Sequence, residues 1–277
     1  MSGGIADIAP ARLALLNGGS VASATLTEGL AIDFAQLLAA AVPDLGAVRL
    51  ERMRAQAAAG ITRRMLLAAQ LLLEANVDLA VLHAHPSDTV RGWACFVVAA
   101  QAGWPLPQQV AAMRPLADDG HFGVREWAWL ALRPHLAEHL PDAIALLAPW
   151  TADPSQRVRR FACEALRPRG VWCAHIAQLK EQPQLALPLL QPLRADPAVY
   201  VQDSVANWLN DAAKTQPDWV RGLCAQWLQE SPAAATQRIC KRAQRSHGGK
   251  LLRQGRYRLG GDGKTGPARH RVRWVRL

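Results

Sequence analysis

Val158-Arg159-Arg160-Phe161-Ala162 is the stretch that decides the fold, because similar stretches recur along the chain. They are VRGWA at 90–94, VREWA at 124–128 and VQDSV at 201–205. The valines that open them are 34, 34 and 43 residues apart. This spacing predicts a repeated structural unit rather than one irregular core.

Each of these junctions has the same expected geometry. An acidic residue in a turn precedes every stretch and can cap the helix that follows; these residues are Asp88, Asp119, Asp153 and Asp196. The valine and the residue four positions later share one helical face and should pack inward. The residue after the valine, an arginine in three of the four stretches, points away from that face.

Units of this length, built as two antiparallel helices, are typical of α-solenoids of the HEAT or armadillo kind. The remaining sequence agrees, because Ala- and Leu-rich segments alternate with Pro, Asp and Gly, and no convincing run of alternating β-branched residues precedes the C-terminal tail. We therefore predict an all-α solenoid of about six helix pairs. An ordinary helical bundle with coincidental repeats is the alternative.

The charge of the chain is concentrated at one end. The 277 residues include 32 Lys and Arg and 22 Asp and Glu, for a net charge of +10. Residues 241–277 hold 12 basic residues and one acid, so this segment is +11 and the first 240 residues are −1. We predict a loose N-terminal segment (1–25), a HEAT-like repeat domain (26–245) and a basic, Gly-rich, flexible tail (246–277) that attracts phosphates non-specifically.

Composition argues against several other classes. Half of the residues are hydrophobic, so the body can bury a core. The longest uncharged stretch, between Arg91 and Arg114, contains Gly, Pro and Gln and fits a membrane span poorly. No secretory signal is visible, and five cysteines without a CxxC pair fit the reduced thiols of a cytoplasmic protein. We expect no membrane association, no metal site and no cofactor.

The helix expected after Ser155 carries the densest charge of the body. Five of the body's twenty basic residues lie within thirteen positions around a single acid, Glu164; they are Arg157, Arg159, Arg160, Arg167 and Arg169. A groove lined in this way can hold phosphates, and a solvated helix face explains the pattern equally well.

Tryptophans and carboxylates provide further candidates, with core packing or ion pairing as the alternative for each. Trp127 and Trp129 are two positions apart, so they point to different helix faces and one of them can line a groove. Trp172 follows a loop and is the best candidate for an exposed ring, whereas Trp208 fits either environment. The carboxylates that stand out are Glu126, Glu164 and Asp211.

Two longer stretches resemble a known family. Residues 158–172 (VRRFACEALRPRGVW) are similar to the VRR-ASE-xx-RPR-xx-W motif of AlkC-type DNA alkylation repair glycosylases. Residues 196–214 (DPAVYVQDSVANWLNDAAK) are similar to that family's D-P-S-x-YV-x-x-SVAN-x-LND-x-x-K. Residues 15–53 also look similar, so the resemblance covers roughly residues 15–245.

The resemblance implies HEAT-like repeats curved around duplex DNA and a monofunctional DNA glycosylase that acts in base excision repair. Its substrates would be N-alkylated, typically cationic bases such as 3-methyladenine or 3-methylcytosine. A cationic base is already a good leaving group, so no strong general acid is needed. A fixed carboxylate can stabilise the oxocarbenium-like sugar and orient water, and an aromatic ring can shield the sugar. Such a family need not flip the base, since it relies on a backbone grip and a DNA kink.

The same resemblance assigns roles to individual residues. Glu164 and Asp211 would be the catalytic carboxylates and Trp172 the sugar-facing aromatic ring. The residues implied to contact DNA are Arg125, Arg159, Arg160, Arg167, Arg169 and Lys214. Further candidates are Glu126, Trp127, Trp208 and His121.

Two positions depart from the family pattern. His121 stands where the family has an acid, which makes Glu126 a candidate substitute, and Gln202 stands where an arginine is common. The expected partner is duplex DNA containing alkylated bases, and no obligate protein partner is implied. The alternative functions are a non-catalytic HEAT-repeat DNA-binding protein and a scaffold for a protein partner.

Overall fold

The computed structural model describes residues 4–170 and 173–245, and within these residues every regular element is helical. Helices α1–α5 are Pro10–Asn17, Leu26–Ala31, Phe34–Ala41, Ala47–Arg54 and Ile61–Glu74. Helices α6–α11 are Leu79–His83, Asp88–Ala99, Leu106–Ala117, Phe122–Glu138, Leu140–Leu147 and Gln156–Glu164. Helices α12–α16 are Ala177–Glu181, Leu187–Leu190, Val199–Ala212, Pro217–Glu230 and Ala234–Ala243. Short 3-10 turns cover Ile5–Asp7, Pro43–Leu45, Ala148–Ala152 and Pro183–Ala186.

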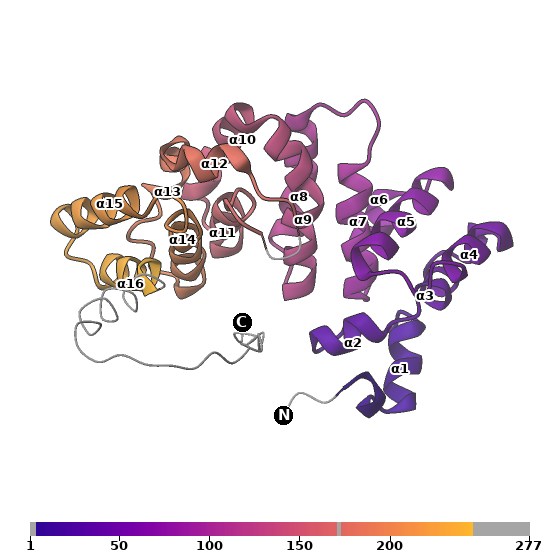
Figure 1. Ribbon diagram of the computed structural model, residues 1–277. Coiled ribbons are helices and arrows are strands. Elements are labelled where there is room, and N and C mark those ends of the chain that lie inside the picture. Colours follow the sequence, from indigo (N-terminus) through magenta and orange to yellow (C-terminus); the bar gives the residue numbers. More distant parts are fainter. Residues whose placement is uncertain (1–3, 171–172, 246–277) are drawn as a thin grey trace, which may run out of the picture.

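The helices form a curved array of two layers, which confirms the predicted α-solenoid (Figure 1). The inner layer is the series α5, α7, α9, α11, α14 and α16, in which each helix contacts the next. The helix or helices that precede each of these members form the second layer, so the described residues contain six successive pairs. In Figure 1, α11, α14 and α16 lie on the inner side of the arc, and α10, α12 and α15 lie on its outer side.

The recurring valines begin the inner helices and point into the core as predicted. Val90, Val124, Val158 and Val201 are fully buried, as are the residues four positions later, Ala94, Ala128, Ala162 and Val205. Gly92, two positions after Val90, lies where α7 and α9 approach closely. A Cβ atom at Gly92 would lie 2.8 Å from Cδ1 of Trp127 on α9.

The acidic residues of three turns bind the N-cap residue of the following helix and do not cap the helix themselves. The carboxylates of Asp119, Asp153 and Asp196 accept the backbone N–H of the N-cap residue two positions later, at 2.7–2.9 Å. At the first junction the corresponding residue is His85, whose Nδ1 accepts the Ser87 N–H. Asp88 does not precede its helix as predicted. It lies in the first turn of α7, and its carboxylate accepts a hydrogen bond from the backbone N–H of Ser23.

The arginine after the valine links neighbouring repeats rather than facing solvent. Arg91 donates from Nε and Nη2 to Asp119 of the next junction, and Arg159 donates in the same way to Asp196. Both arginines also donate from Nη1 to two carbonyls of their own preceding loop. Each pair thus forms a rung that fixes one repeat against the next.

The N-terminal segment 1–25 differs from the loose chain that the sequence predicts. Its described residues include α1, in which Leu16 is fully buried against the core. Arg12 forms an ion pair with Glu28 at 2.8 Å, and Ser23 donates from both its backbone N and its Oγ to Asp88. These contacts tie the segment to α2 and α7. The basic segment predicted as a flexible tail, 246–277, lies outside the described residues.

The core supports the remaining expectations from composition. Trp93, Trp208 and Trp227 are fully buried, so at least three tryptophans are packing residues. All five cysteines are free, and Cys173 alone among them is only half-buried. No helix in the described part of the chain is long and apolar enough to cross a membrane.

Candidate carboxylate–arginine site

Charged residues on the neighbouring inner helices α9 and α11 meet charged residues at the end of α14. Glu126 and Arg160 each lie two residues after the repeat valine, on α9 and α11, and Glu164 follows one turn after Arg160. Since α11 packs against both α9 and α14, these side chains meet those of α14. We call this group the carboxylate cluster; its members are Glu126, Arg160, Glu164, Arg167, Asp211 and Lys214.

Glu164 is the buried centre of the carboxylate cluster, with 4% of its surface exposed. Its Oε1 accepts a hydrogen bond from Nη1 of Arg167 at 2.7 Å, and its Oε2 accepts one from Oγ of Ser204 at 2.5 Å. Burial raises the pKa of Glu164, but the charges of Arg167 and Arg160 outweigh burial and lower it to about 2. Glu164 is therefore an anion at neutral pH, held in one orientation.

Asp211 is equally buried and shares a cation with Glu164. Arg167 donates from Nε and Nη2 to Oδ2 of Asp211 at 3.0 and 2.6 Å, so one guanidinium bridges the two carboxylates. Lys214 contacts Oδ1 of Asp211 at 2.8 Å and keeps 46% of its side chain exposed. Arg169 donates to the backbone carbonyl of Asp211 at 3.3 Å.

Glu126 joins the carboxylate cluster through Arg160. Nη2 of Arg160 lies 2.7 Å from Oε1 of Glu126, and the indole N–H of Trp129 donates to Oε2 at 2.8 Å. The charges of Glu164 and Glu126 oppose the effect of burial and raise the pKa of Arg160 above its usual value. Arg160 is thus fixed as a cation between two acids.

Tyr200 and Ser204 are site residues that the sequence analysis did not select. The guanidinium of Arg160 lies 4.5 Å from the centre of the Tyr200 ring, and that of Arg125 lies 5.3 Å from it while its Nε donates to the hydroxyl. Ser204 binds Glu164. Both belong to the stretch 196–214 that carries the resemblance. Their place in that motif is the sequence feature that could have marked them as candidate site residues.

Several predicted residues have structural roles elsewhere. Arg159 is engaged with Asp196 and two carbonyls. Arg125 donates to the carbonyls of Asp119 and Gly120 in addition to Tyr200. Trp208 is a core residue whose indole N–H binds the carbonyl of Leu166.

His121 and Trp127 lie outside the carboxylate cluster, and Trp172 lies outside the described residues. His121 is the N-cap of α9; its Nδ1 accepts the Gly123 N–H and its Nε2 lies 2.6 Å from the carbonyl oxygen of Ser23. Both contacts fit the tautomer in which Nε2 carries the proton, and Nδ1 also lies 3.4 Å from Oδ2 of Asp88.

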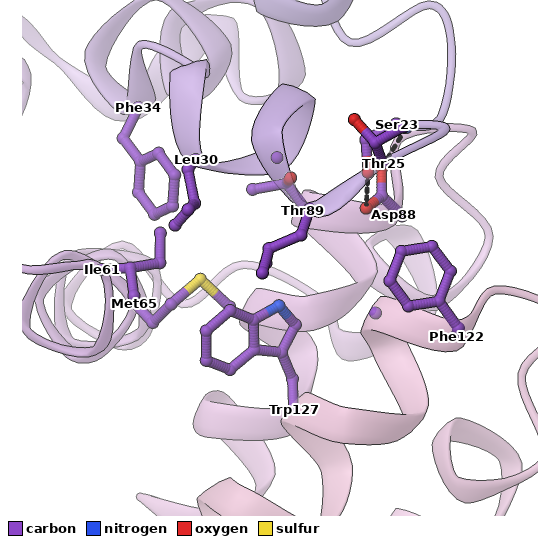
Figure 2. Close-up of a pocket in the computed structure, with 13 residues that line it drawn as sticks. Ser23, Thr25, Leu30, Phe34, Ile61, Met65, Asp88, Thr89, Phe122 and Trp127 are labelled. Atoms are coloured by element: carbon purple, nitrogen blue, oxygen red, sulfur yellow. Dashed lines mark hydrogen bonds between the residues drawn. The ribbon is translucent and has the colours of Figure 1, made fainter. Parts of the chain in front are cut away.

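Trp127 lines a small cavity between α2, α5, α7 and α9 (Figure 2). The cavity has a volume of about 40 Å³, and its lining is mostly apolar, with Asp88 at one edge. It shares no residue with the carboxylate cluster. Among the described residues, no group of three or more potential ligands could hold a metal ion.

Comparisons with known proteins agree with this architecture. Residues 77–167 match the family model of HEAT repeats, and residues 124–243 match the family model described as DNA alkylation repair enzyme. The second match includes every member of the carboxylate cluster. The chain thus resembles the DNA alkylation repair enzymes over residues 124–243, which confirms the resemblance inferred from its motifs.

Particular relatives refine this result. The chain is similar to the alkylpurine DNA glycosylase AlkC of Pseudomonas fluorescens bound to DNA containing an abasic site analogue, with 29% identity and a TM-score of 0.64. The match covers 80% of this chain and 62% of AlkC. AlkD2 from Streptococcus mutans has the same fold, with 22% identity, a TM-score of 0.51, and 71% and 87% of the two chains covered.

One curated relative matches over a shorter region. It is the protein YhaZ of Bacillus subtilis, which is 40% identical over 84 residues. These residues make up 30% of this chain and 22% of YhaZ. The chain thus spans about a fifth of YhaZ and less than two thirds of AlkC.

Proposed function

We propose that this protein is a monofunctional DNA glycosylase that hydrolyses the N-glycosidic bond of cationic, alkylated bases in duplex DNA. The observation that carries the proposal is the pair of buried carboxylates, Glu164 and Asp211, held by one guanidinium in the region that matches the DNA alkylation repair family. The similarity to AlkC over 80% of the chain supports the same substrate class, with 3-methyladenine and 3-methylcytosine as the first lesions to test.

The chemistry fits carboxylates that remain ionised. When the bond to a cationic base breaks, positive charge moves onto the deoxyribose, and a nearby anion stabilises that charge. A pKa of about 2 keeps Glu164 anionic throughout the physiological pH range. Asp211 is the better placed of the two to approach a sugar, because one of its two cationic partners is the partly exposed Lys214.

Binding of DNA would release Asp211 from one of its two cations. Lys214 keeps 46% of its side chain exposed, so solvent screens its ion pair with Asp211 and the pair contributes about 1 kcal/mol or less. A DNA phosphate can therefore compete for Lys214 at little cost. Lys214, Arg167 and Arg169 are our candidates for phosphate contacts, with Arg160 and Arg125 behind them. We propose that residues 26–245 form the DNA-binding unit and that the protein acts in the cytoplasm, on chromosomal DNA.

A base-release assay tests this proposal directly. Duplex DNA treated with a methylating agent is incubated with the protein, and the freed bases are separated and identified. We expect release of methylated bases by the wild type and a loss of about 100-fold in the rate for Asp211→Asn and Glu164→Gln. Glu74→Gln is the matched control, because Glu74 forms an ion pair with Arg52 on α4 and α5, outside the carboxylate cluster.

A second function is favoured by the ion pairing itself. All three carboxylates of the cluster have cationic partners, as expected of a protein that retains a DNA-binding surface without catalysis. Such a protein would bind duplex DNA in a salt-dependent manner and release no base. Absence of released base from the wild type, together with retained DNA binding, would replace the first proposal by this one.

A further inference from the structure

Arg133 on α9 is a buried cation that the proposed chemistry does not use. Only 2% of its surface is exposed. Its Nη1 donates to the carbonyl of Ala165 at 2.8 Å, its Nη2 to those of Arg167 and Ala174 at 2.6 and 3.2 Å, and its Nε to that of Ala174 at 3.3 Å. No carboxylate of the described residues forms an ion pair with it. Arg133 is thus held by carbonyl oxygens alone.

These carbonyls belong to the two ends of the loop that follows α11. Ala165 and Arg167 come directly after α11, and Ala174 comes just before α12. The loop is also closed by a hydrogen bond from the Ile176 N–H to the Pro168 carbonyl at 3.1 Å. A single guanidinium therefore connects both ends of the loop to α9.

Arg133 binds the turn that follows α11. Buried backbone carbonyls of such a turn need hydrogen-bond donors from elsewhere in the protein. Arg133 satisfies those of Ala165 and Arg167, and the indole of Trp208 satisfies that of Leu166 between them. A guanidinium can do this because it presents five donors in a rigid plane, whereas a lysine presents three around one point.

The backbone that Arg133 binds includes Arg167, whose side chain contacts both buried carboxylates. The backbone carbonyl of Arg167 accepts a hydrogen bond from Arg133, while the guanidinium of Arg167 reaches Glu164 and Asp211 at 2.7 and 2.6 Å. A shift of this backbone by one ångström would break both contacts, since hydrogen bonds weaken steeply beyond about 3.2 Å.

We propose that Arg133 is a positioning residue: its guanidinium fixes the loop after α11 so that Arg167 stays between Glu164 and Asp211. This role rests on the proposed function, which supplies the reaction for which the position matters. It predicts a larger loss of turnover than of DNA affinity, because Arg133 is itself too deeply buried to contact a phosphate and can change affinity only through Arg167 and Arg169.

Cys173 provides a local readout that does not depend on activity. It lies next to Ala174 and is the only half-buried cysteine of the described residues, whereas the other four are buried. Burial raises the pKa of the Cys173 thiol, and the charges of Arg133 and Arg167 oppose that effect. Arg133→Lys keeps the charge and removes the planar set of donors, so faster alkylation of Cys173 in this variant would report release of the loop.

The experiment compares the wild type, Arg133→Lys and Arg91→Lys, in which Arg91 likewise binds loop carbonyls but in another repeat. Alkylation by N-ethylmaleimide is followed at each cysteine by mass spectrometry. In Arg133→Lys we expect about tenfold faster modification of Cys173 alone, and kcat for base release about tenfold lower with KM within twofold. In Arg91→Lys we expect neither change. Circular dichroism identifies a variant that does not fold, and Arg133→Gln then replaces Arg133→Lys.

Three results would overturn the proposal. Unchanged Cys173 alkylation in the folded Arg133 variant would show that the loop does not depend on Arg133. Equal acceleration at all five cysteines would show general loosening of the structure. Unchanged kcat would show that the loop does not position the reaction. Absence of base release by the wild type would defeat the proposed function instead, and alkylation of Cys173 would still decide whether Arg133 holds the loop.

Discussion

Replacement of Glu164 by glutamine should change the stability of the protein in a way that depends on pH. The carboxyl group has a pKa of about 2 in the folded protein, against an ordinary value of 4.5. A lowered pKa means that the ionised group stabilises the folded state above pH 4.5, and that this stabilisation is lost as the pH falls toward 2. At about 1.4 kcal/mol per pKa unit, the contribution at pH 7 is about 3 kcal/mol.

The same linkage gives the size of the change at intermediate pH. Protonation of this carboxyl group in the unfolded state, where its pKa is the ordinary 4.5, removes about 2 of these 3 kcal/mol between pH 7 and pH 3. Glu164→Gln should therefore be less stable than the wild type by about 3 kcal/mol at pH 7 and by about 1 kcal/mol at pH 3.

Urea unfolding followed by tryptophan fluorescence at pH 7, 5, 4 and 3 measures this difference directly. Glu74→Gln is the control, because Glu74 is paired at the surface and the difference from wild type should be small at every pH. A difference between wild type and Glu164→Gln that stays constant from pH 7 to pH 3 would refute the reasoning. It would mean that Glu164 is not held as an anion by Arg160 and Arg167.

Three further perturbations test other parts of the structure. Arg159→Met should destabilise the protein by about 3 kcal/mol, because it leaves the buried Asp196 without its cation; thermal unfolding measures this. The same change should leave DNA affinity nearly unchanged in a duplex-binding titration. Lys214→Ala should reduce the slope of log affinity against log salt by about 1 while changing stability by less than about 1 kcal/mol; an unchanged slope would exclude Lys214 from phosphate contact. Gly92→Ala should lower stability by about 1–3 kcal/mol, because the new methyl group would lie 2.8 Å from the Trp127 ring, and an unaltered melting temperature would contradict this close packing.

Much of the fold could be predicted because the relevant signal is local in the sequence. The burial of Val90, Val124 and their equivalents follows from helical periodicity at regularly spaced junctions. The N-terminal segment was harder, because what orders it is a contact between Ser23 and Asp88, 65 residues apart in the chain. No local pattern indicates a contact of that kind.

The site could be predicted only in part, for a related reason. The resemblance selected Glu164, Asp211 and Arg167, which do come together. Whether an exposed-looking arginine meets a phosphate or a carboxylate depends on how one repeat is rotated against the next. Arg159 illustrates this, since its partner Asp196 belongs to the following repeat. The same limit explains why the carbonyl contacts of Arg133 were not anticipated.

The pair Arg160–Glu126 has a consequence for the mechanics of the array. Rungs between Arg and Asp join α7 to α9 and α11 to α14. Between α9 and α11 there is no such rung, because Arg125, the equivalent arginine, binds Tyr200. The ion pair that joins α9 to α11 in the described part of the chain is Arg160–Glu126. The carboxylate cluster is therefore also the joint between two repeats. By thermodynamic reciprocity, a ligand that draws Arg160 away from Glu126 makes the array easier to bend there, and a bent array binds that ligand more tightly by the same factor.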